Sequence, residues 1–161
     1  MGMIQKILNT EETSYSSNLN IEHVKNRIEG LLEHKTLRIS GKLTSKNEFT
    51  VYDKFNVIGW NMPNLRRKSA YIKGNLKQKE TGTLIKLTAK PNAILPIFAT
   101  LAFVGGVLIA FMALSIAKDD KFLLILGFTF VVFGIVYYPL STFFRNRLRN
   151  KIVKYLGLIK E

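Results

Sequence analysis

The chain has 161 residues, nearly half of them apolar, and its 24 Lys and Arg against 11 Asp and Glu give a net charge of +13. It contains no cysteine, which excludes disulfides, thiolate metal sites and cysteine nucleophiles. The apolar residues gather in uncharged runs that begin near residue 91, so the mixed, polar opening segment is not expected to be a secretory signal peptide.

The first predicted element is an amphipathic helix. Residues 1–18 are polar, and we expect a flexible N-terminal segment there. Asn20 is a suitable N-cap for a helix over 20–33. Its apolar residues recur at helical spacing: Ile21, Val24, Ile28, Leu31 and Leu32. We expect this apolar face to pack on a sheet formed by the residues that follow.

Two stretches, at about 36–55 and 69–90, then alternate apolar and polar residues with the period of two that is typical of half-buried strands. Polar turns at 44–48 and 78–82 divide each stretch, which predicts two β-hairpins. Between them, residues 55–60 form a further extended stretch, either a strand or an irregular continuation.

The first strands of the two hairpins share a frame. Residues 38–46 read RISGKLTSK and residues 71–79 read YIKGNLKQK, so I-x-G-x-L-x-x-K occurs twice. Gly41 and Gly74 fall on the apolar face, where a glycine permits a bulge, a bend or the close approach of another backbone. The echo indicates either a repeated unit that curls the sheet around the helix, or chance.

The densest basic run of this part is Arg66, Arg67 and Lys68, which follow Trp60. A solvated or lipid-facing loop is one interpretation. The other is a ligand site, in which Trp60 stacks and the three cations contact an anion.

The predicted hairpin of 92–144 has the length and composition of two transmembrane helices. Its segments 92–117 and 122–144 each exceed the roughly 20 residues that cross a hydrocarbon core of about 30 Å. Each segment has one face of small residues. These are Ala99, Ala102, Gly106, Ala110, Ala113 and Ala117 in the first segment, and Gly127, Gly134 and Ser141 in the second. Small residues allow the close backbone approach that drives association in lipid. The two faces either pack the spans together or leave one face for an oligomer.

The charges predict the topology. Residues 1–91 hold 16 Lys and Arg against 8 Asp and Glu, the tail 145–161 holds 6 against 1, and the link 118–121 is neutral. Lys and Arg near span ends stay on the cytoplasmic side, so both termini are expected to be cytoplasmic. Neither span holds an ionisable residue, which argues against a pump or an ion-coupled transporter.

The tail 145–161 is predicted to be a basic amphipathic C-terminal helix. Its apolar face consists of Leu148, Ile152, Tyr155, Leu156 and Ile159. It either extends the second span or lies on the inner leaflet, as a topology anchor or a partner-binding helix. Anionic lipid is the expected partner of this positive charge, and nucleic acid is not expected.

The order of these elements resembles a group of small bacterial membrane proteins without assigned function. The resemblance covers about residues 35–140. It rests on paired I-x-G-x-(I/L) hairpins and on a G-T-x-I-x-L strand over 82–87 that runs through Lys90 and Pro91 into the apolar hairpin. It implies a bacterial membrane protein and carries over no functional residue.

No catalytic motif occurs in the sequence, whether P-loop, dinucleotide fingerprint, nucleophile elbow or zinc signature. His23 and His34 lie eleven residues apart, about three helical turns, and cannot share a metal locally. We therefore expect neither enzymatic activity nor a cofactor or metal site.

The sequence predicts an α+β membrane protein: a small antiparallel β-sheet module with one amphipathic helix over 19–91, then a two-helix transmembrane hairpin. The leading function is a membrane-anchored binding or assembly protein. Its cytoplasmic module would recognise a partner or ligand at the inner face of the bacterial membrane, and a second copy of the chain is one candidate partner. The alternative is an oligomerising, membrane-disrupting effector of a bacterial defence system.

Overall fold

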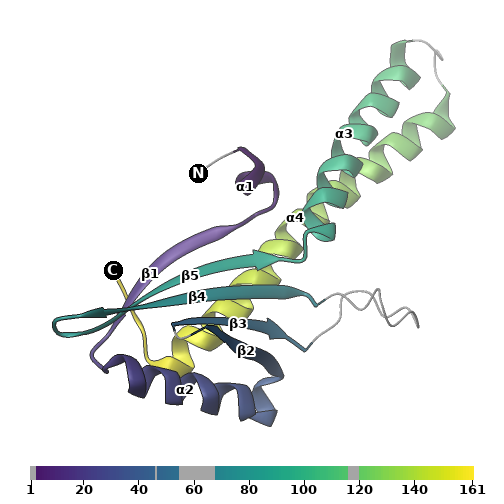
Figure 1. The fold of residues 1–161 in the computed structure, drawn as a ribbon. Coiled ribbons are helices and arrows are strands. Elements are labelled where there is room, and N and C mark those ends of the chain that lie inside the picture. The colour runs from purple at the N-terminus through teal and green to yellow at the C-terminus, as the bar shows by residue number, and fades with distance from the viewer. Residues whose placement is uncertain (1–2, 46, 55–67, 116–119) are drawn as a thin grey trace. The chain divides into compact units, whose positions relative to one another are not determined.

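The computed structural model describes residues 3–45, 47–54, 68–115 and 120–161 (Figure 1). The chain forms two compact units. The first, here called the hairpin unit, comprises Met1–Asn9 and Ala93–Phe143. The second, here called the sheet module, comprises Thr10–Asn92 and Phe144–Glu161.

Within the described residues, the sheet module contains a six-stranded antiparallel sheet in the order β2-β3-β4-β5-β1-β6. Its strands are β1 (Glu11–Ser17), β2 (Ile39–Ser45), β3 (Glu48–Asp53), β4 (Ala70–Lys79), β5 (Gly82–Pro91) and β6 (Ile159–Lys160). The β2–β3 and β4–β5 pairs confirm the two predicted hairpins. The extended stretch expected at 55–60 lies outside the described residues.

One face of the sheet forms the core of this module. The alternating residues Phe49 and Val51 of β3, Ile72 of β4 and Ile85 of β5 have no exposed surface. We call this side the inner face. The opposite residues of the strands are mostly polar and form the outer face, so the predicted alternation separates a dry side of the sheet from a wet side.

Helix α2 (Ile21–Glu33) packs in this core, as its apolar face predicted (Figure 1). Val24, Ile28 and Leu31 are its buried residues. The helix begins where the sequence indicated, because the Asn20 side chain accepts a hydrogen bond from the backbone N–H of His23 at 2.9 Å. A short 3-10 helix, η1 (Lys35–Leu37), follows α2.

The two glycines of the repeated frame both border β3. Gly41 of β2 pairs with Val51, and Gly74 of β4 pairs with Phe49. A Cβ atom added at Gly74 would overlap the Phe49 ring, and one added at Gly41 would overlap the carbonyl oxygen of Thr50. Among the roles that the sequence left open, the structure therefore shows close approach of the neighbouring strand.

The expectation of a flexible segment over 1–18 is wrong for the described residues of that range. Helix α1 (Met3–Ile7) forms first, and β1 then pairs with β5 along its whole length, from Glu11 opposite Ala89 to Ser17 opposite Thr83. The strand has a single large apolar residue, Tyr15, so its alternation was too weak to indicate a strand. Pairing with the edge of β5 orders it instead.

The C-terminal residues belong to the core of the sheet module. Leu148 and Ile152 have no exposed surface and Leu156 is 2% exposed, in the same apolar cluster as the sheet and α2. Helix α4 (Lys121–Leu156) is continuous, so the tail does extend the second predicted span. Placement of its apolar face on the inner leaflet is wrong for Leu148, Ile152 and Leu156, which are buried against protein. The predicted helix also ends before Ile159, which lies in β6 and is exposed.

Ion pairs within the module neutralise part of the positive charge of the tail. Arg145 lies 2.8 Å from Glu11, which Arg149 also contacts. Lys151 lies 3.6 Å from Asp53, a carboxylate of the inner face that is 3% exposed. The cations of the tail were expected to set the topology and to contact lipid, but three of them have partners on the sheet.

We expect Ile152→Ala to destabilise the protein by about 2–5 kcal/mol, the range for truncating a buried isoleucine. Thermal unfolding in mild detergent measures this loss. Ile159→Ala is the matched control, because Ile159 is 61% exposed and its truncation should change the free energy of unfolding by no more than about 0.5 kcal/mol. Equal effects of the two substitutions would contradict burial of the tail.

The hairpin unit contains α1, α3 (Ile94–Ser115) and the part of α4 up to Phe143. Both α3 and α4 are long and apolar enough to cross a membrane. At 1.5 Å per residue, the 22 residues of α3 extend about 33 Å, close to the thickness of a hydrocarbon core. Large apolar side chains remain exposed on both helices, among them Leu101, Phe111, Phe122 and Phe128.

Candidate functional site

Helices α3 and α4 meet at glycines. A Cβ atom at Gly106 would lie 2.7 Å from the carbonyl oxygen of Gly127, and one at Gly127 would lie 2.7 Å from the backbone nitrogen of Ala110. At Gly134 it would lie 2.8 Å from the carbonyl oxygen of Ala99. Real Cβ atoms essentially never come this close, so a larger residue at any of these glycines must push the helices apart.

Both small-residue faces therefore contribute to the contact between α3 and α4. Ala102 and Ala113 on α3 are 5% and 1% exposed, and Ser141 on α4 has no exposed surface. Gly105, one residue before Gly106, has no atom within 4 Å of an added Cβ. Neighbouring glycines of α3 thus face in different directions, one toward α4 and one toward open space.

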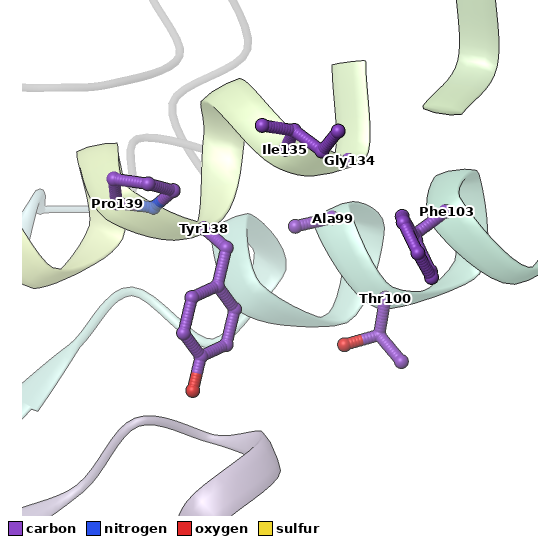
Figure 2. A pocket seen from close by; sticks show the side chains of 7 residues that line it. All are labelled: Ala99, Thr100, Phe103, Gly134, Ile135, Tyr138 and Pro139. Carbon is purple, nitrogen blue, oxygen red and sulfur yellow. The ribbon is translucent and has the colours of Figure 1, made fainter. Parts of the chain in front are cut away.

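A groove of about 340 Å³ lies between α3 and α4 (Figure 2). Its lining residues are Ala99, Thr100, Phe103, Gly134, Ile135, Tyr138 and Pro139. Both of its hydroxyl groups are engaged, because Thr100 donates to the carbonyl of Pro96 at 2.9 Å and Tyr138 to the carbonyl of Lys6 at 3.2 Å. The lining contains no charged side chain, so the groove suits an aliphatic chain better than a polar substrate.

Asn9 connects the N-terminal segment to α4. Its backbone is left-handed, with φ of 53°, and its side-chain amide donates to Ser141 Oγ at 3.0 Å and Thr142 Oγ1 at 2.6 Å. Ser141 donates in turn to the carbonyl of Tyr138 at 2.7 Å. This network was not predicted from the sequence. Its signal was an asparagine, a residue that tolerates this backbone conformation, and a Ser-Thr pair near the end of the second apolar span.

Lys68 is the described member of the predicted anion site, while Trp60, Arg66 and Arg67 lie outside the described residues. Its ammonium lies 5.7 Å from the centre of the Tyr52 ring, within the range of a cation–π contact. Its backbone N–H donates to the Tyr71 hydroxyl at 3.3 Å, and its carbonyl accepts from the Asn92 side chain at 3.0 Å. These contacts fix Lys68 at one end of the sheet.

The outer face of the sheet is rich in lysine. Exposed lysines on β2, β4 and β5 are Lys42, Lys73, Lys77, Lys79, Lys86 and Lys90. Glu161 contacts Lys79, and two further carboxylates lie among the lysines: Glu48 is 3.1 Å from Lys73, and Glu12 is 2.9 Å from Lys86. The hydrogen bond and positive charge of the lysine hold the pKa of the Glu48 and Glu12 carboxyls below the ordinary value, so both are ionised at neutral pH. Lysines outnumber carboxylates here, so the face is net positive.

A second groove, of about 470 Å³, lies in the sheet module beside α2. It is lined by Leu19, His23, Asn26, Arg27, Gly30 and Tyr155. Arg27 donates to the carbonyl of Leu156 at 3.4 Å and so caps the end of α4. His34, which follows the last residue of α2, lies edge-on to Tyr155 at 5.8 Å between ring centres. In the described parts of the chain, no group of three or more His, Asp or Glu could hold a metal ion.

No family model, no curated protein and no solved structure matches this chain.

Proposed function

We propose that this protein is a membrane-anchored binding protein of the bacterial inner membrane. Helix α3 and the first part of α4 cross the bilayer, and the sheet module lies on the cytoplasmic side with both termini. The observation that carries the proposal is the combination of two helices with uncharged spans, whose large apolar side chains are exposed, and a module that has a buried core of its own. Exposed apolar surface of this kind suits lipid and not water.

The outer face of the sheet is the proposed binding surface. The inner face is covered by α2 and the end of α4, whereas the lysines of the outer face are exposed. A net positive face recognises a partner of negative charge, and complementary charge accelerates their encounter. An enzymatic role is not part of this proposal.

The alternative of an oligomerising effector rests on a small-residue face that remains available to a second copy. Gly106, Gly127 and Gly134 instead lie in the contact between α3 and α4 of one chain. The hairpin thus gives the effector function no specific support, and we do not propose it.

The absence of cysteine makes the topology directly testable. We expect a membrane-impermeant maleimide to label Asp120→Cys in intact spheroplasts, because the link is predicted to be periplasmic. Thr88→Cys, on the outer face of the sheet, should react only after lysis. Labelling of Thr88→Cys before lysis would place the module outside the cell and end the proposal.

Single-cysteine variants also test binding. A thiol-linked photo-crosslinker at Thr88→Cys is expected to give a discrete adduct in cells, since Thr88 lies in the middle of the proposed surface. At Glu29→Cys, an exposed position of α2, no adduct should form. Identical patterns at the two positions would remove the outer face as the binding surface while leaving the anchor intact.

A further inference from the structure

We propose that one corner of the outer face binds the anionic phospholipid headgroups of the bilayer in which the chain is anchored. The corner consists of Tyr52, Lys68, Tyr71 and Lys90. This inference rests on the proposed function, because it requires that α3 enter the membrane. On this proposal the outer face has two regions: the corner binds lipid, and the rest of the face binds a partner.

The corner is a row of side chains across three strands. Tyr52 of β3 pairs with Tyr71 of β4, and Tyr71 pairs with Lys90 of β5. Neighbouring strands lie about 4.8 Å apart, so these side chains stand next to one another on the outer face. Lys68 joins the row through its ammonium on the Tyr52 ring and its backbone contact with the Tyr71 hydroxyl. The side chains that form this row include no carboxylate.

The chain itself holds this corner near the start of the apolar hairpin. Lys90 is four residues before Ile94, where α3 begins, and four residues reach at most about 14 Å. Asn92, whose side chain holds the carbonyl of Lys68, is only two residues before Ile94. These bounds follow from chain length alone. The headgroup region adjoining the first span is therefore within reach of both lysines.

The residue types suit that region. Tyrosine is enriched at membrane interfaces, where its ring lies among the headgroups and its hydroxyl stays wet. Lysine near an anionic leaflet is attracted to lipid phosphate and extends its ammonium toward it. Tyr71 is 36% exposed and Lys90 is exposed, so both are available. The nearest carboxylates of the outer face, Glu12 and Glu48, pair with Lys86 and Lys73. The charge of Lys90 also helps to lower the pKa of Glu12, but no ion pair joins the two side chains.

A single-stranded nucleic acid could also contact tyrosine rings and lysines on a sheet. The short reach from Lys90 to α3 favours lipid, because the anchored chain keeps headgroups at a high effective concentration beside the corner. Nucleic acid is therefore the competing outcome of the experiment.

The first measurement is amine footprinting of the full chain in nanodiscs of phosphatidylglycerol or phosphatidylcholine. We expect the acetylation rates of Lys68 and Lys90 to fall at least about threefold in the anionic discs, given the affinity of lysine for an anionic surface. Lys77 is the internal control: it lies on the same face, at the other end of β4, six residues beyond Tyr71. Equal rates in the two lipids, or equal protection of Lys77, would overturn the proposal.

The second measurement uses charge removal at matched positions. Lys68→Gln with Lys90→Gln should lower the amount of phosphatidylglycerol that the protein retains in native mass spectrometry by about fivefold for each lysine. The control pair, Lys77→Gln with Lys42→Gln, removes the same charge from exposed positions of the outer face outside the corner and should retain lipid as the parent does. Equal loss in both pairs would show unspecific attraction and overturn the proposal.

A third arm adds a single-stranded oligonucleotide to the phosphatidylcholine discs. Protection of Lys68 and Lys90 by the oligonucleotide, without protection by phosphatidylglycerol, would identify a nucleic-acid surface and overturn the lipid assignment. The topology and crosslinking results are independent of this outcome. Failure at the corner therefore leaves the proposed function standing, whereas loss of membrane insertion removes both.

Discussion

Replacing Gly106 by leucine is expected to separate α3 from α4, while the same replacement at Gly105 leaves the hairpin intact. A leucine at Gly106 would meet the backbones of Gly127 and Val131 at 2.7 Å, and backbone atoms cannot rotate away as a side chain can. At Gly105 a Cβ atom meets no atom within 4 Å. Helix association in lipid depends on close van der Waals packing, so loss of contact at Gly106 removes its main source.

The measurement is the fraction of folded protein that survives heating in mild detergent. Gly106→Leu should lower the midpoint strongly, since overpacking typically costs about 1–3 kcal/mol and this contact involves two backbones. Gly105→Leu should behave like the parent. If the two leucine variants are equally stable, the contact between α3 and α4 is not formed as described. If Gly106→Leu instead yields a folded monomer from a larger parent, Gly106 serves an oligomer interface.

The parts of the fold that could be predicted from sequence are those whose residues repeat a local period. The strands of both hairpins alternate strictly, and α2 combines an apolar stripe with an asparagine cap, so each is specified by neighbours in the chain. The apolar helices were predicted for the same reason, because length and lack of charge are local properties.

The tail was misplaced because its pattern fits two environments. A basic helix with one apolar face suits an anionic leaflet and a half-covered sheet equally well. Geometry could have decided between them. The four predicted strands at about 4.8 Å make a sheet about 14 Å wide, and one helix of about 10 Å cannot cover it. The inner face therefore needed a second helix, and the apolar stripe of 145–156 was the remaining candidate.

The corner proposed as a lipid contact was beyond sequence reasoning because it depends on strand register. Tyr52, Tyr71 and Lys90 are 19 residues apart along the chain, and only the pairing of β3, β4 and β5 makes them neighbours. Lys68 was identified from the local run of basic residues. Tyr52 and Tyr71, which contact Lys68, were not identified, because a basic run gives no information on which strand lies beside it.

Replacing Gly41 or Gly74 by valine is the second substitution with a large expected effect. Each should destabilise the sheet module by about 1–3 kcal/mol, the usual range for overpacking. Ser40→Val is the matched control, since it adds the same side chain to the outer face of β2, where strands accept β-branched residues. Thermal unfolding of the full chain in detergent measures the three variants, and a Gly41→Val protein as stable as the Ser40→Val control would contradict the close approach of β3.

The two glycines should differ in whether a second substitution rescues them. The obstacle at Gly74 is the ring of Phe49, a side chain that can be shortened, whereas at Gly41 it is the carbonyl oxygen of Thr50. The double variant Phe49→Leu with Gly74→Ala should therefore lose less free energy of unfolding than the sum of the losses in the two single variants. In a double-mutant cycle we expect a coupling of about 1 kcal/mol. Combined with Gly41→Ala, Phe49→Leu should show no such coupling, because shortening a side chain does not move the backbone of β3. Equal coupling at both glycines would mean that they share one role, and the distinction between a ring contact and a backbone contact would be lost.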